Sequence, residues 1–477
     1  MKNTDNQPVR GGTEHAHPMW PEPRASTGLL VDLYHLDAAY VSWRTGQNAA
    51  ATFDLYTRAA PFGGAYLLTA GLEPALAFVR AFRYTEDDLA YLARVKAYAP
   101  AFLDELRRFQ FTGELLAMPE GTIAFADEPL VRVTAPFREA LLLESGLLRA
   151  IGVSTLIATK AARLVDAAAG REVADFGFRR AHDPYLAARA AIIGGCASTS
   201  FVAGAKVFDL PTAGTIPHAL VQAFATEEDA FRAVAETFDR YSLLLDTYDV
   251  PTAIATAAVV ARDAQARFGH ELAAVRLDSG DLLADSIHVR RVLDVAGLRE
   301  TKVLVSGDID EFRIADLLAA GAPIAGFGVG GNLAVGLGTV ASGAVGGVLG
   351  AVYKLAWYEG GDDPARIKLA GGKTTWPGRK VVYRCGEFAE DLIQLDSEPE
   401  PAGGRPLLEP AIRAGAVIAD VPSVHDLQTR AVANVRSLPE RYRALRDPAP
   451  YPVRRSQGLL ELRERVSQQH APGHVAR

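Results

Sequence analysis

Four aspartates stand in two pairs directly after apolar runs of this 477-residue sequence. Asp246 and Asp249 follow the run SLLL, and Asp278 and Asp281 follow AAVRL. Carboxylates can hold Mg²⁺ through water or accept hydrogen bonds from sugar hydroxyls. Capping of the next helix would explain any single aspartate. Four of them at paired positions favour a binding site.

Two glycine-containing segments are suited to binding phosphate. GFGVGGN (326–332) follows an apolar run, and glycine lets backbone N–H groups approach an anion closely. Ser306-Gly307-Asp308 follows the apolar run TKVLV, and N–H groups at the start of a helix favour anions. A packing role would explain the glycine loop alone equally well. At two successive strand ends, however, the segments look like the phosphate clamp of barrels that bind phosphosugars.

Arginines and histidines close to these segments could complete a site. Arg179 and Arg180 follow DFGF, and a guanidinium suits bidentate recognition of carboxylate or phosphate. His182 lies just beyond them, and His218 closes the segment GTIPH. A lone histidine is usually structural or solvated. Among phosphate-binding strand ends, His218 becomes a candidate proton carrier or nucleophile.

The elements that must position these residues follow a recurring order of apolar strand, polar or glycine cluster, and amphipathic helix. This order occurs at 172–182, 210–220, 242–250, 273–297, 301–321 and 322–332. Strands that alternate with helices at this spacing predict parallel βα units. Such folds place their sites at the carboxyl ends of the strands, where the polar clusters fall. We predict an α/β fold with an incomplete, irregular barrel over 151–345.

The flanking regions predict a second domain. Residues 28–150 mix helical patterns such as EPALAFVRAFR with short strands such as PLVRVTAPF, which indicates an N-terminal α/β domain. After 345, the strand-like KVVYRCGEF and the basic helix pattern DLQTRAVANVRSLPERYRAL suggest that 346–477 returns to that domain. Residues 1–27 are a polar, proline-containing tail that we expect to be disordered.

Composition excludes several classes of protein. The net charge of −7 and the pI near 5.9 argue against a nucleic-acid binder. Two cysteines are too few for a disulfide framework, and the tail lacks the apolar core of a signal peptide. Leu317–Tyr353 has no charged residue, but its eleven glycines and Pro323 break it into pieces too short to span a membrane. We expect a soluble, cytoplasmic protein.

From Asp32 to about residue 450, the sequence resembles nicotinate phosphoribosyltransferase. The segments that carry the resemblance are DLYHLDAAY (32–40), FDLYTRAAPFGGAYLLTAGLEPAL (53–76), STLIATKAARL (154–164), DFGFRRAH (175–182), GTIPHAL (214–220), LLLDTYD (243–249), RLDSGDL (276–282) and GFGVGG (326–331). So many motifs in order are very specific for that family.

The resemblance implies a reaction, a fold and an assembly. Nicotinate and phosphoribosyl pyrophosphate would yield nicotinate mononucleotide and pyrophosphate, with ATP hydrolysis coupled through a phosphorylated histidine and Mg²⁺ accompanying the phosphate substrates. The fold would be that of a type II phosphoribosyltransferase, an incomplete α/β barrel with an α/β sandwich domain. The protein would be a homodimer in which each active site is completed by the neighbouring subunit.

The resemblance also implies roles for individual residues. His218 stands where the family carries its phosphorylated histidine, and we expect it to be catalytic together with Asp246 and Asp278. The expected substrate-binding residues are Tyr34 and Phe176 at the pyridine ring, Arg179 and Thr215, Arg276 near the ribose and diphosphate, and Ser306, Gly307, Asp308, Gly330 and Gly331 near the 5′-phosphate. No residue is assigned as a protein ligand of a metal ion. We therefore interpret Asp278 as a ligand of the sugar or of a metal shell, and Ser279-Gly280 as the turn.

The sequence departs from the family pattern at two places and leaves alternatives open. Ala197-Ser198-Thr199-Ser200 stands where many members read GTSN, and Pro217 precedes His218 where many have Ala or Glu. A nicotinamide or quinolinate enzyme is the alternative within the same class. A non-catalytic sensor of phosphoribosyl ligands is the alternative outside it, although sensing would not need His218.

Overall fold

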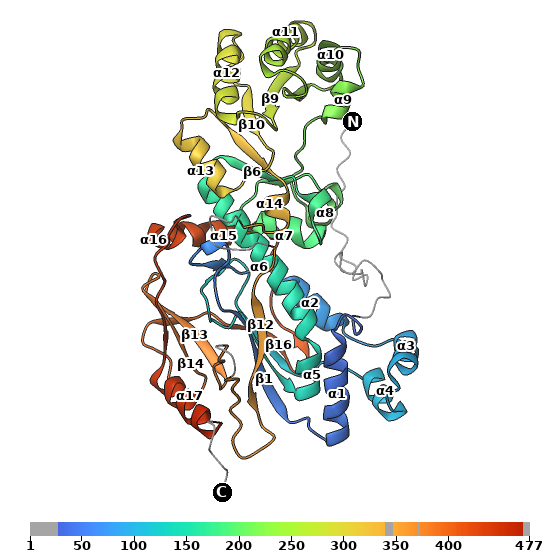
Figure 1. Ribbon diagram of the computed structural model, residues 1–477, viewed down its shortest axis with the longest axis vertical. Coiled ribbons are helices and arrows are strands. Elements are labelled where there is room, and N and C mark those ends of the chain that lie inside the picture. The colour runs from blue at the N-terminus through green and yellow to red at the C-terminus, as the bar shows by residue number, and fades with distance from the viewer. Residues whose placement is uncertain (1–26, 339–346, 370–372, 471–477) are drawn as a thin grey trace, which may run out of the picture.

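The computed structural model describes residues 27–338, 347–369 and 373–470. The expected disordered tail, 1–27, lies outside the described residues except for Thr27. Figure 1 shows an upper half built around one six-stranded sheet and a lower half that contains a six-stranded and a four-stranded sheet, with the long helix α6 (Glu144–Ala167) running from one half into the other. Sixteen residues of α6 are buried, so this helix is part of the core of both halves.

The upper sheet has six strands in the order β7-β6-β11-β10-β9-β8, and every neighbouring pair is parallel. The strands are β6 (Glu172–Asp175), β7 (Ser198–Thr199), β8 (Arg240–Leu244), β9 (Glu271–Leu277), β10 (Lys302–Val305) and β11 (Gly326–Val329). Because β7 and β8 are the sheet's edges and do not pair with each other, the barrel is incomplete, as the sequence predicts.

Helices follow the strands of this sheet and cover it. They are α7 (Pro184–Ile193), α8 (Val202–Phe208), α9 (His218–Gln222), α10 (Glu227–Thr237), α11 (Val250–Phe268), α12 (Leu282–Val295), α13 (Glu311–Ala319) and α14 (Gly331–Ala334), with a short 3₁₀ turn, η2 (Phe178–Arg180), after β6. Strands covered on both faces are apolar throughout, and all four residues of β11 are buried.

The lower half contains an antiparallel sheet in the order β12-β1-β5-β3-β16-β17. Its strands are β1 (Ala50–Thr57), β3 (Glu114–Ala117), β5 (Val131–Pro136), β12 (Ala351–Tyr358), β16 (Glu409–Arg413) and β17 (Ala416–Val417). Two strands from the end of the chain thus pair directly with strands from its beginning, since β12 pairs with β1 and β16 pairs with β3. The domain boundaries themselves stay a prediction.

The remaining elements surround this sheet. They are η1 (Pro61–Gly63), α1 (Leu33–Thr45), α2 (Leu72–Ala81), α3 (Glu86–Lys96), α4 (Pro100–Arg107), α5 (Phe137–Leu142), the pair β2 (Leu67–Leu68) and β4 (Ile123–Ala124), the sheet of β15 (Gly404–Pro406), β13 (Lys380–Cys385), β14 (Glu390–Leu395) and β18 (Val453–Arg455), and α15 (Val424–Ser437), α16 (Glu440–Arg443) and α17 (Gln457–Gln469).

One expected strand does not form. Residues 210–217 form a loop that joins the upper sheet through a single bridge between Thr199 and Thr212, and 218–220 begin α9. Pro211, Gly214 and Pro217 explain the difference, because proline cannot donate a ladder hydrogen bond and glycine weakens a strand.

Two further expectations concern the cysteines and the uncharged stretch Leu317–Tyr353. Cys196 is buried in the upper half, and neither it nor Cys385 is in a disulfide. The described part of the uncharged stretch contains the end of α13, β11, α14, the start of β12 and loops, and 339–346 lies outside the described residues. No helix in the described part of the chain is both long enough and apolar enough to cross a membrane.

Candidate active site

A polar cavity of about 370 Å³ lies at the carboxyl ends of the upper strands. The loops after β6, β9, β10 and β11 line it together with the segment 214–217. The structure brings together at this cavity nine of the residues that the sequence analysis selects, namely Phe176, Arg179, Thr215, Arg276, Asp278, Ser306, Gly307, Asp308 and Gly330.

The four aspartates separate into two functional groups. Asp249 and Asp281 are N-caps: Asp249 accepts the Thr252 backbone N–H at 3.0 Å, and Asp281 accepts that of Ala284 at 3.1 Å. The helix-capping explanation therefore holds for these two. Of the four, Asp278 lines the cavity and Asp246 is hydrogen-bonded to its backbone, so the expectation that all four ring one mouth is wrong.

Asp246 and Asp278 form one hydrogen-bonded unit. One oxygen of Asp246 accepts the Asp278 backbone N–H at 3.1 Å and also the Ser279 hydroxyl. The Asp278 carboxylate accepts the hydroxyl of Ser306, which lies at the end of the next strand. The other oxygen of Asp246, Oδ1, is buried and has no hydrogen-bond partner among the described residues. A buried acceptor without a partner is costly, so this oxygen is suited to a ligand hydroxyl or a bound water.

Arg276 lies inside the cavity rather than at its rim. Its Nε is buried without a partner among the described residues. Burial lowers the pKa of this guanidinium, the charges of Asp278 and Asp246 oppose that effect, and the charge of Arg179 adds to it. An arginine pKa lies far above neutrality, so Arg276 remains a cation that is aimed into the cavity.

The loop after β10 has a constrained backbone. Gly307 has φ +84°, and a Cβ at this position would lie 1.8 Å from the carbonyl oxygen of Asp278. Only glycine fits there. Asp308 also has a positive φ of 39°, which is unfavourable for a residue with a side chain.

A second loop and an arginine complete this side of the cavity. The Asn332 side chain donates to the Ile309 carbonyl at 2.9 Å, which joins the loop after β11 to the loop after β10. Arg180 lies over the glycine loop: a Cβ on Gly331 would be 3.0 Å from its Cδ, and one on Gly330 would be 3.4 Å from Nη1. Two glycine loops and a guanidinium therefore meet in an arrangement that is suited to an anion.

Phe176 provides an aromatic face to the cavity. A Cβ on Gly328 would lie 2.4 Å from the Phe176 ring, so glycine in β11 is what lets the ring lie against this strand. A smaller cavity of about 110 Å³ continues beneath and is lined by Phe176, Thr215 and Arg276 among others. The arrangement suits a flat ring placed between an aromatic side chain and cationic groups.

His218 is the first residue of α9 and lies just beyond Pro217, which lines the cavity. Its Nδ1 is 3.1 Å from the hydroxyl of Thr247, which follows Asp246 in sequence. This contact holds the imidazole close to the paired carboxylates. Among the described residues, Nε2 has no hydrogen-bond partner and is the nitrogen available for reaction.

Tyr34 is the expected site residue that the single chain does not bring to the cavity. It lies on α1 in the lower half, whereas β9 and β10 lie in the upper half (Figure 1). Its side chain is 60% exposed.

Three residues that shape the site are not among those predicted from the sequence. Arg180 was considered with Arg179 but not selected, although its position over the glycine loop is the more direct one. Gly328 could have been found because glycine inside an apolar strand signals a close approach. Asp175 is buried and accepts the Gly177 N–H and the Thr199 hydroxyl, both at 2.8 Å, and no sequence signal marks it.

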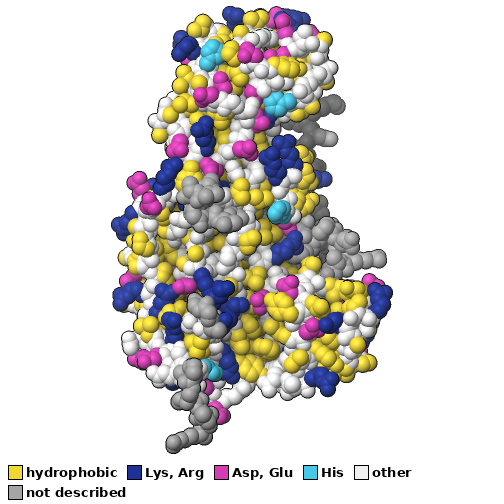
Figure 2. Space-filling view, viewed as in Figure 1, with side chains coloured by type: hydrophobic (Ala, Val, Ile, Leu, Met, Phe, Trp, Pro, Cys, Tyr) yellow, Lys and Arg dark blue, Asp and Glu magenta, His cyan; other side chains and the backbone are white. Residues whose placement is uncertain are grey.

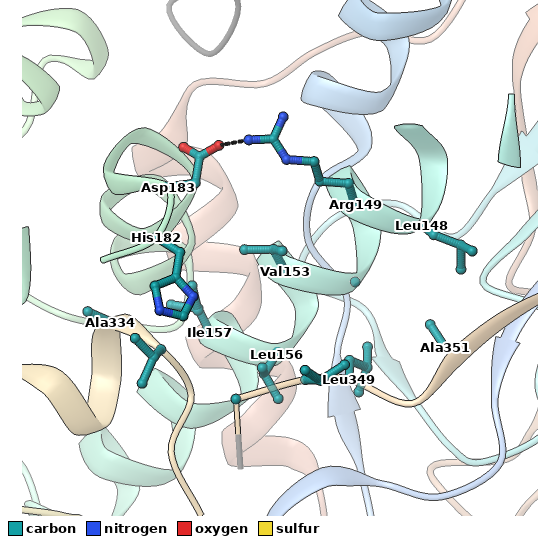
Figure 3. Close-up of a pocket in the computed structure, with 14 residues that line it drawn as sticks. Leu148, Arg149, Val153, Leu156, Ile157, His182, Asp183, Ala334, Leu349 and Ala351 are labelled. Atoms are coloured by element: carbon teal, nitrogen blue, oxygen red, sulfur yellow. Dashed lines mark hydrogen bonds and ion pairs between the residues drawn. The ribbon is translucent and has the colours of Figure 1, made fainter. Parts of the chain in front are cut away.

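A larger cavity, of about 420 Å³, lies elsewhere and is mostly apolar. Figure 3 shows the His182 ring at its edge and the Arg149–Asp183 ion pair, whose atoms are 2.8 Å apart, at its rim. His182 thus faces this cavity, while Arg179 and Arg180 face the polar one. Its apolar lining offers few groups for chemistry, so size does not identify the active site.

The residues present fit Mg²⁺ as a cation shared with substrate. Among the described residues, no group of three or more histidine, cysteine, aspartate or glutamate side chains could hold a metal ion by itself. Asp278 and the unpartnered Oδ1 of Asp246 nevertheless supply oxygens of the kind that Mg²⁺ prefers.

Comparisons with known proteins agree with this geometry. The family model "Nicotinate phosphoribosyltransferase (NAPRTase) family" matches residues 171–345, and the models of the family's N-terminal and C-terminal domains match 29–152 and 400–463. The chain is 39% identical over 433 residues to nicotinate phosphoribosyltransferase pncB2 of Mycobacterium tuberculosis, which covers 89% of this chain and 90% of the relative.

Two further relatives are similar over most of their length. Nicotinate phosphoribosyltransferase of Bacillus subtilis is 37% identical over 465 residues, covering 90% of this chain and 92% of the relative. The crystal structure of human nicotinic acid phosphoribosyltransferase superposes with a TM-score of 0.79 at 29% identity, over 91% of this chain and 99% of the human chain. The chain therefore belongs to the nicotinate phosphoribosyltransferase family.

Proposed function

We propose that the protein transfers the phosphoribosyl group of phosphoribosyl pyrophosphate to nicotinate, which gives nicotinate mononucleotide and pyrophosphate in the salvage of nicotinate for NAD synthesis. The observation that carries this proposal is the polar cavity, where an aromatic ring, three arginines and two glycine loops meet at adjacent strand ends. Membership of the family supports it.

Each part of the cavity suits one part of the substrates. The glycine loops at Gly307 and Gly330, with Arg180 above them, suit the 5′-phosphate. Arg276 and the carboxylates of Asp246 and Asp278 suit the ribose and the diphosphate. The pyridine ring would stack on Phe176, and its carboxylate would pair with Arg179, beside Thr215.

The reaction needs positioning and charge stabilisation more than acid–base chemistry. The pyridine nitrogen lone pair forms a bond to ribose C1 while the C1–oxygen bond breaks and its electrons leave on pyrophosphate. Positive charge develops on the ribose, where the carboxylates of Asp246 and Asp278 stabilise it. Arg276 stabilises the negative leaving group. The rigid loops hold both reactants so that the reacting atoms are aligned.

Mg²⁺ is proposed to bind with the diphosphate beside Asp246 and Asp278. When bound, it would supply positive charge to the leaving group. The unpartnered Asp246 oxygen would hold it directly or through water, and the hydrogen bond from Ser306 would orient Asp278.

ATP hydrolysis is proposed to couple to synthesis through His218. Phosphoryl transfer from ATP to Nε2 would break the bond between the γ-phosphorus and the bridging oxygen, release ADP and form a high-energy N–P bond. Water would later cleave that bond and release phosphate. The hydrogen bond between Nδ1 and Thr247 supports Nε2 as the reacting nitrogen.

The active protein is proposed to be a homodimer in which each site receives Tyr34 from the neighbouring subunit. Its position on α1, away from its own cavity, supports this (Figure 1). The side chains of Leu33, Val41, Tyr91 and Val95 are also exposed on α1 and α3. Figure 2 shows hydrophobic side chains gathered over the lower part of the visible face, where these helices lie. Such an apolar surface is typical of an interface.

Selectivity for the acid over the amide tests the proposed substrate. The N–H₂ group of a carboxamide can donate hydrogen bonds to an aspartate or glutamate, whereas a carboxylate would be repelled by either side chain. The segment Ala197–Ser200 offers hydroxyls instead, Ser200 lines the cavity, and Arg179 and Arg180 supply positive charge. With phosphoribosyl pyrophosphate, Mg²⁺ and ATP, we expect turnover of nicotinate and little of nicotinamide or quinolinate.

The assay measures formation of each mononucleotide when the three pyridines compete. Preference for nicotinamide or quinolinate would replace the proposed substrate with that alternative. Tight binding of phosphoribosyl pyrophosphate without turnover of any of the three would instead support a ligand sensor.

A further inference from the structure

Behind the glycine loops lies a buried cluster of charged side chains that the proposed reaction does not use. Lys160 and Arg163 are on α6, and Glu311 is the first residue of α13. Lys160 Nζ pairs with one oxygen of Glu311, and Arg163 Nε is 3.0 Å from the other. All three side chains are at most 1% exposed, so we call them the α6–α13 ion cluster.

The cluster is electrostatically complementary but costly to assemble. Burial alone would raise the pKa of Glu311, yet the positive charges of Lys160 and Arg163 outweigh it and hold the pKa below its ordinary value. Burial lowers the pKa of Lys160 against the opposing charge of Glu311. Buried ion pairs of this kind contribute little net stability compared with an apolar core. A role in fixing one local arrangement is therefore the better explanation for it.

The cluster also contacts the lower half. Lys160 Nζ lies 4.8 Å from the ring centroid of Phe62, which belongs to η1 and has a left-handed backbone with φ 62°. Arg163 Cζ is 5.9 Å from the same ring. Its Nη2 donates to the Leu445 carbonyl at 3.4 Å. The start of α13 is thus held both by α6 and by segments from elsewhere in the chain.

What this anchor supports is the constrained loop after β10. Glu311 follows Asp308 by three residues, and Asp308 and Gly307 both have positive φ. Between them and the helix, Asp310 caps α13 by accepting the Arg313 backbone N–H at 2.8 Å. A strained backbone persists only where its surroundings over-determine it. The ion cluster fixes the helix end of the loop, and packing of Gly307 on Asp278 fixes the strand end.

We propose that Lys160, Arg163 and Glu311 are positioning residues for the phosphate loop, and that they set the affinity for the phosphoribosyl donor without touching it. The inference rests on the proposed function. It assigns to the α6–α13 ion cluster an effect on donor binding that is separate from its effect on folding.

Lys160→Met is the main test, and Lys380→Met is its matched control. Lys380 is also a buried lysine paired with a buried carboxylate, since its Nζ is 2.7 Å from Asp54, but it lies in β13 of the lower half. Lys160→Met leaves the buried Glu311 with Arg163 as its remaining cationic partner, and Lys380→Met removes the lysine that pairs with the buried Asp54, so both should lower the melting temperature. Glu311→Gln, which keeps the side-chain size, is a second test variant.

The measurements are calorimetric titration with phosphoribosyl pyrophosphate and Mg²⁺, and KM for each substrate. For Lys160→Met and Glu311→Gln we expect a donor Kd and KM raised about tenfold, with the KM for nicotinate unchanged. Lys380→Met should keep wild-type values for both substrates despite its lower melting temperature.

Three results would overturn the inference. The first is a wild-type donor Kd in both cluster variants. The second is a loss of donor binding that only follows the fraction of unfolded protein. The third is a rise of the donor Kd in Lys380→Met that equals the rise in the cluster variants. If wild-type protein itself neither binds phosphoribosyl pyrophosphate nor makes nicotinate mononucleotide, the proposed function fails instead, so the two failures are distinguishable.

Discussion

At the scale of single residues, His218 contacts Thr247 through Nδ1, and its Nε2 has no hydrogen-bond partner in the part of the chain that the structure describes. Because Nδ1 is engaged by Thr247, a phosphoryl group would be carried on Nε2. We expect His218→Ala to lose ATP hydrolysis and acid-labile phosphate labelling while it retains slow, ATP-independent synthesis, since the glycosyl step depends on the carboxylates and arginines. Labelling with γ-³²P ATP and measurement of ADP per nucleotide formed would check this.

Thr247→Val serves as the graded control for that experiment. It keeps the imidazole but removes its hydrogen-bond partner, so labelling should fall without disappearing. ATP hydrolysis that stays in step with product in His218→Ala would place the coupling histidine elsewhere. His182 would then be tested before His35, because His35 is only 1% exposed and its Nε2 lies 3.1 Å from Glu144.

Arg179 is exposed at the cavity rim, so its importance depends on a bound ligand and not on packing. Arg179→Lys replaces a planar fork with a point charge, and a hydrogen bond to a charged group contributes roughly 1.5–3 kcal/mol. We expect KM for nicotinate to rise about tenfold or more. Arg299→Lys, at an exposed position between α12 and β10, is the control. Unchanged KM for both substrates in Arg179→Lys would show that Arg179 is only solvated.

The sequence predicts which residue types the site contains better than it predicts their individual roles. Asp246 and Asp249 occupy equivalent places after a strand, yet one is hydrogen-bonded to the backbone of Asp278 and the other caps a helix. The difference depends on whether a backbone N–H two or three residues ahead captures the carboxylate. That is settled by loop geometry, which the order of residues does not reveal.

At the scale of elements, the docking of the C-terminal strands involves two buried carboxyl groups. Glu128 precedes β5, and Asp391 lies on β14 beside Arg384 of β13. Arg384 donates to both oxygens of Asp391, at 3.0 and 2.6 Å, and the Tyr451 hydroxyl donates to it at 2.8 Å. Burial, together with the neighbouring charge of Asp391, raises the pKa of Glu128 well above its ordinary value.

This pair predicts a pH dependence of stability. A carboxyl group whose pKa is raised in the folded state contributes stability below its unfolded pKa, and that contribution is lost as pH rises toward and through the folded pKa. Glu128→Gln resembles the protonated acid and cannot ionise. We expect the melting temperature of Glu128→Gln minus that of wild type to increase as pH rises from 5 to 9. A constant difference across that range would contradict a raised pKa.

The order of elements in the upper half follows from local patterns, and the errors there have local causes. Runs of apolar residues ending in polar clusters predict β6, β8, β9, β10 and β11 because parallel strands are buried on both faces. The segment 210–220 follows the same rule in composition, but two prolines prevent a strand. The pairing of β12 with β1 joins residues about 300 positions apart, and no local pattern carries such information.

At the scale of the whole molecule, one predicted site residue, Tyr34, lies away from the cavity of its own chain. Tyr34 is exposed on α1, and the ring pocket at Phe176 is in the other half (Figure 1). A second copy would supply Tyr34 without any change of fold, and a two-fold arrangement would complete both sites at once. This is a testable property of mixtures of subunits.

Tyr34→Ala and Asp278→Ala should each be inactive alone and should regain activity when their subunits are mixed. In a shared-site dimer, one site of each mixed dimer would receive both defects and the other would receive neither. After random exchange at equal concentrations, half of the dimers are mixed and each has one intact site, so about a quarter of wild-type activity should return.

The control mixes Asp278→Ala with Arg276→Ala. Both of those residues come from the same chain's cavity, so every site keeps a defect and no activity should return. Native mass spectrometry would verify exchange, and a mixture of Tyr34→Ala and Asp278→Ala that stays inactive after verified exchange would show that each subunit carries a self-contained site.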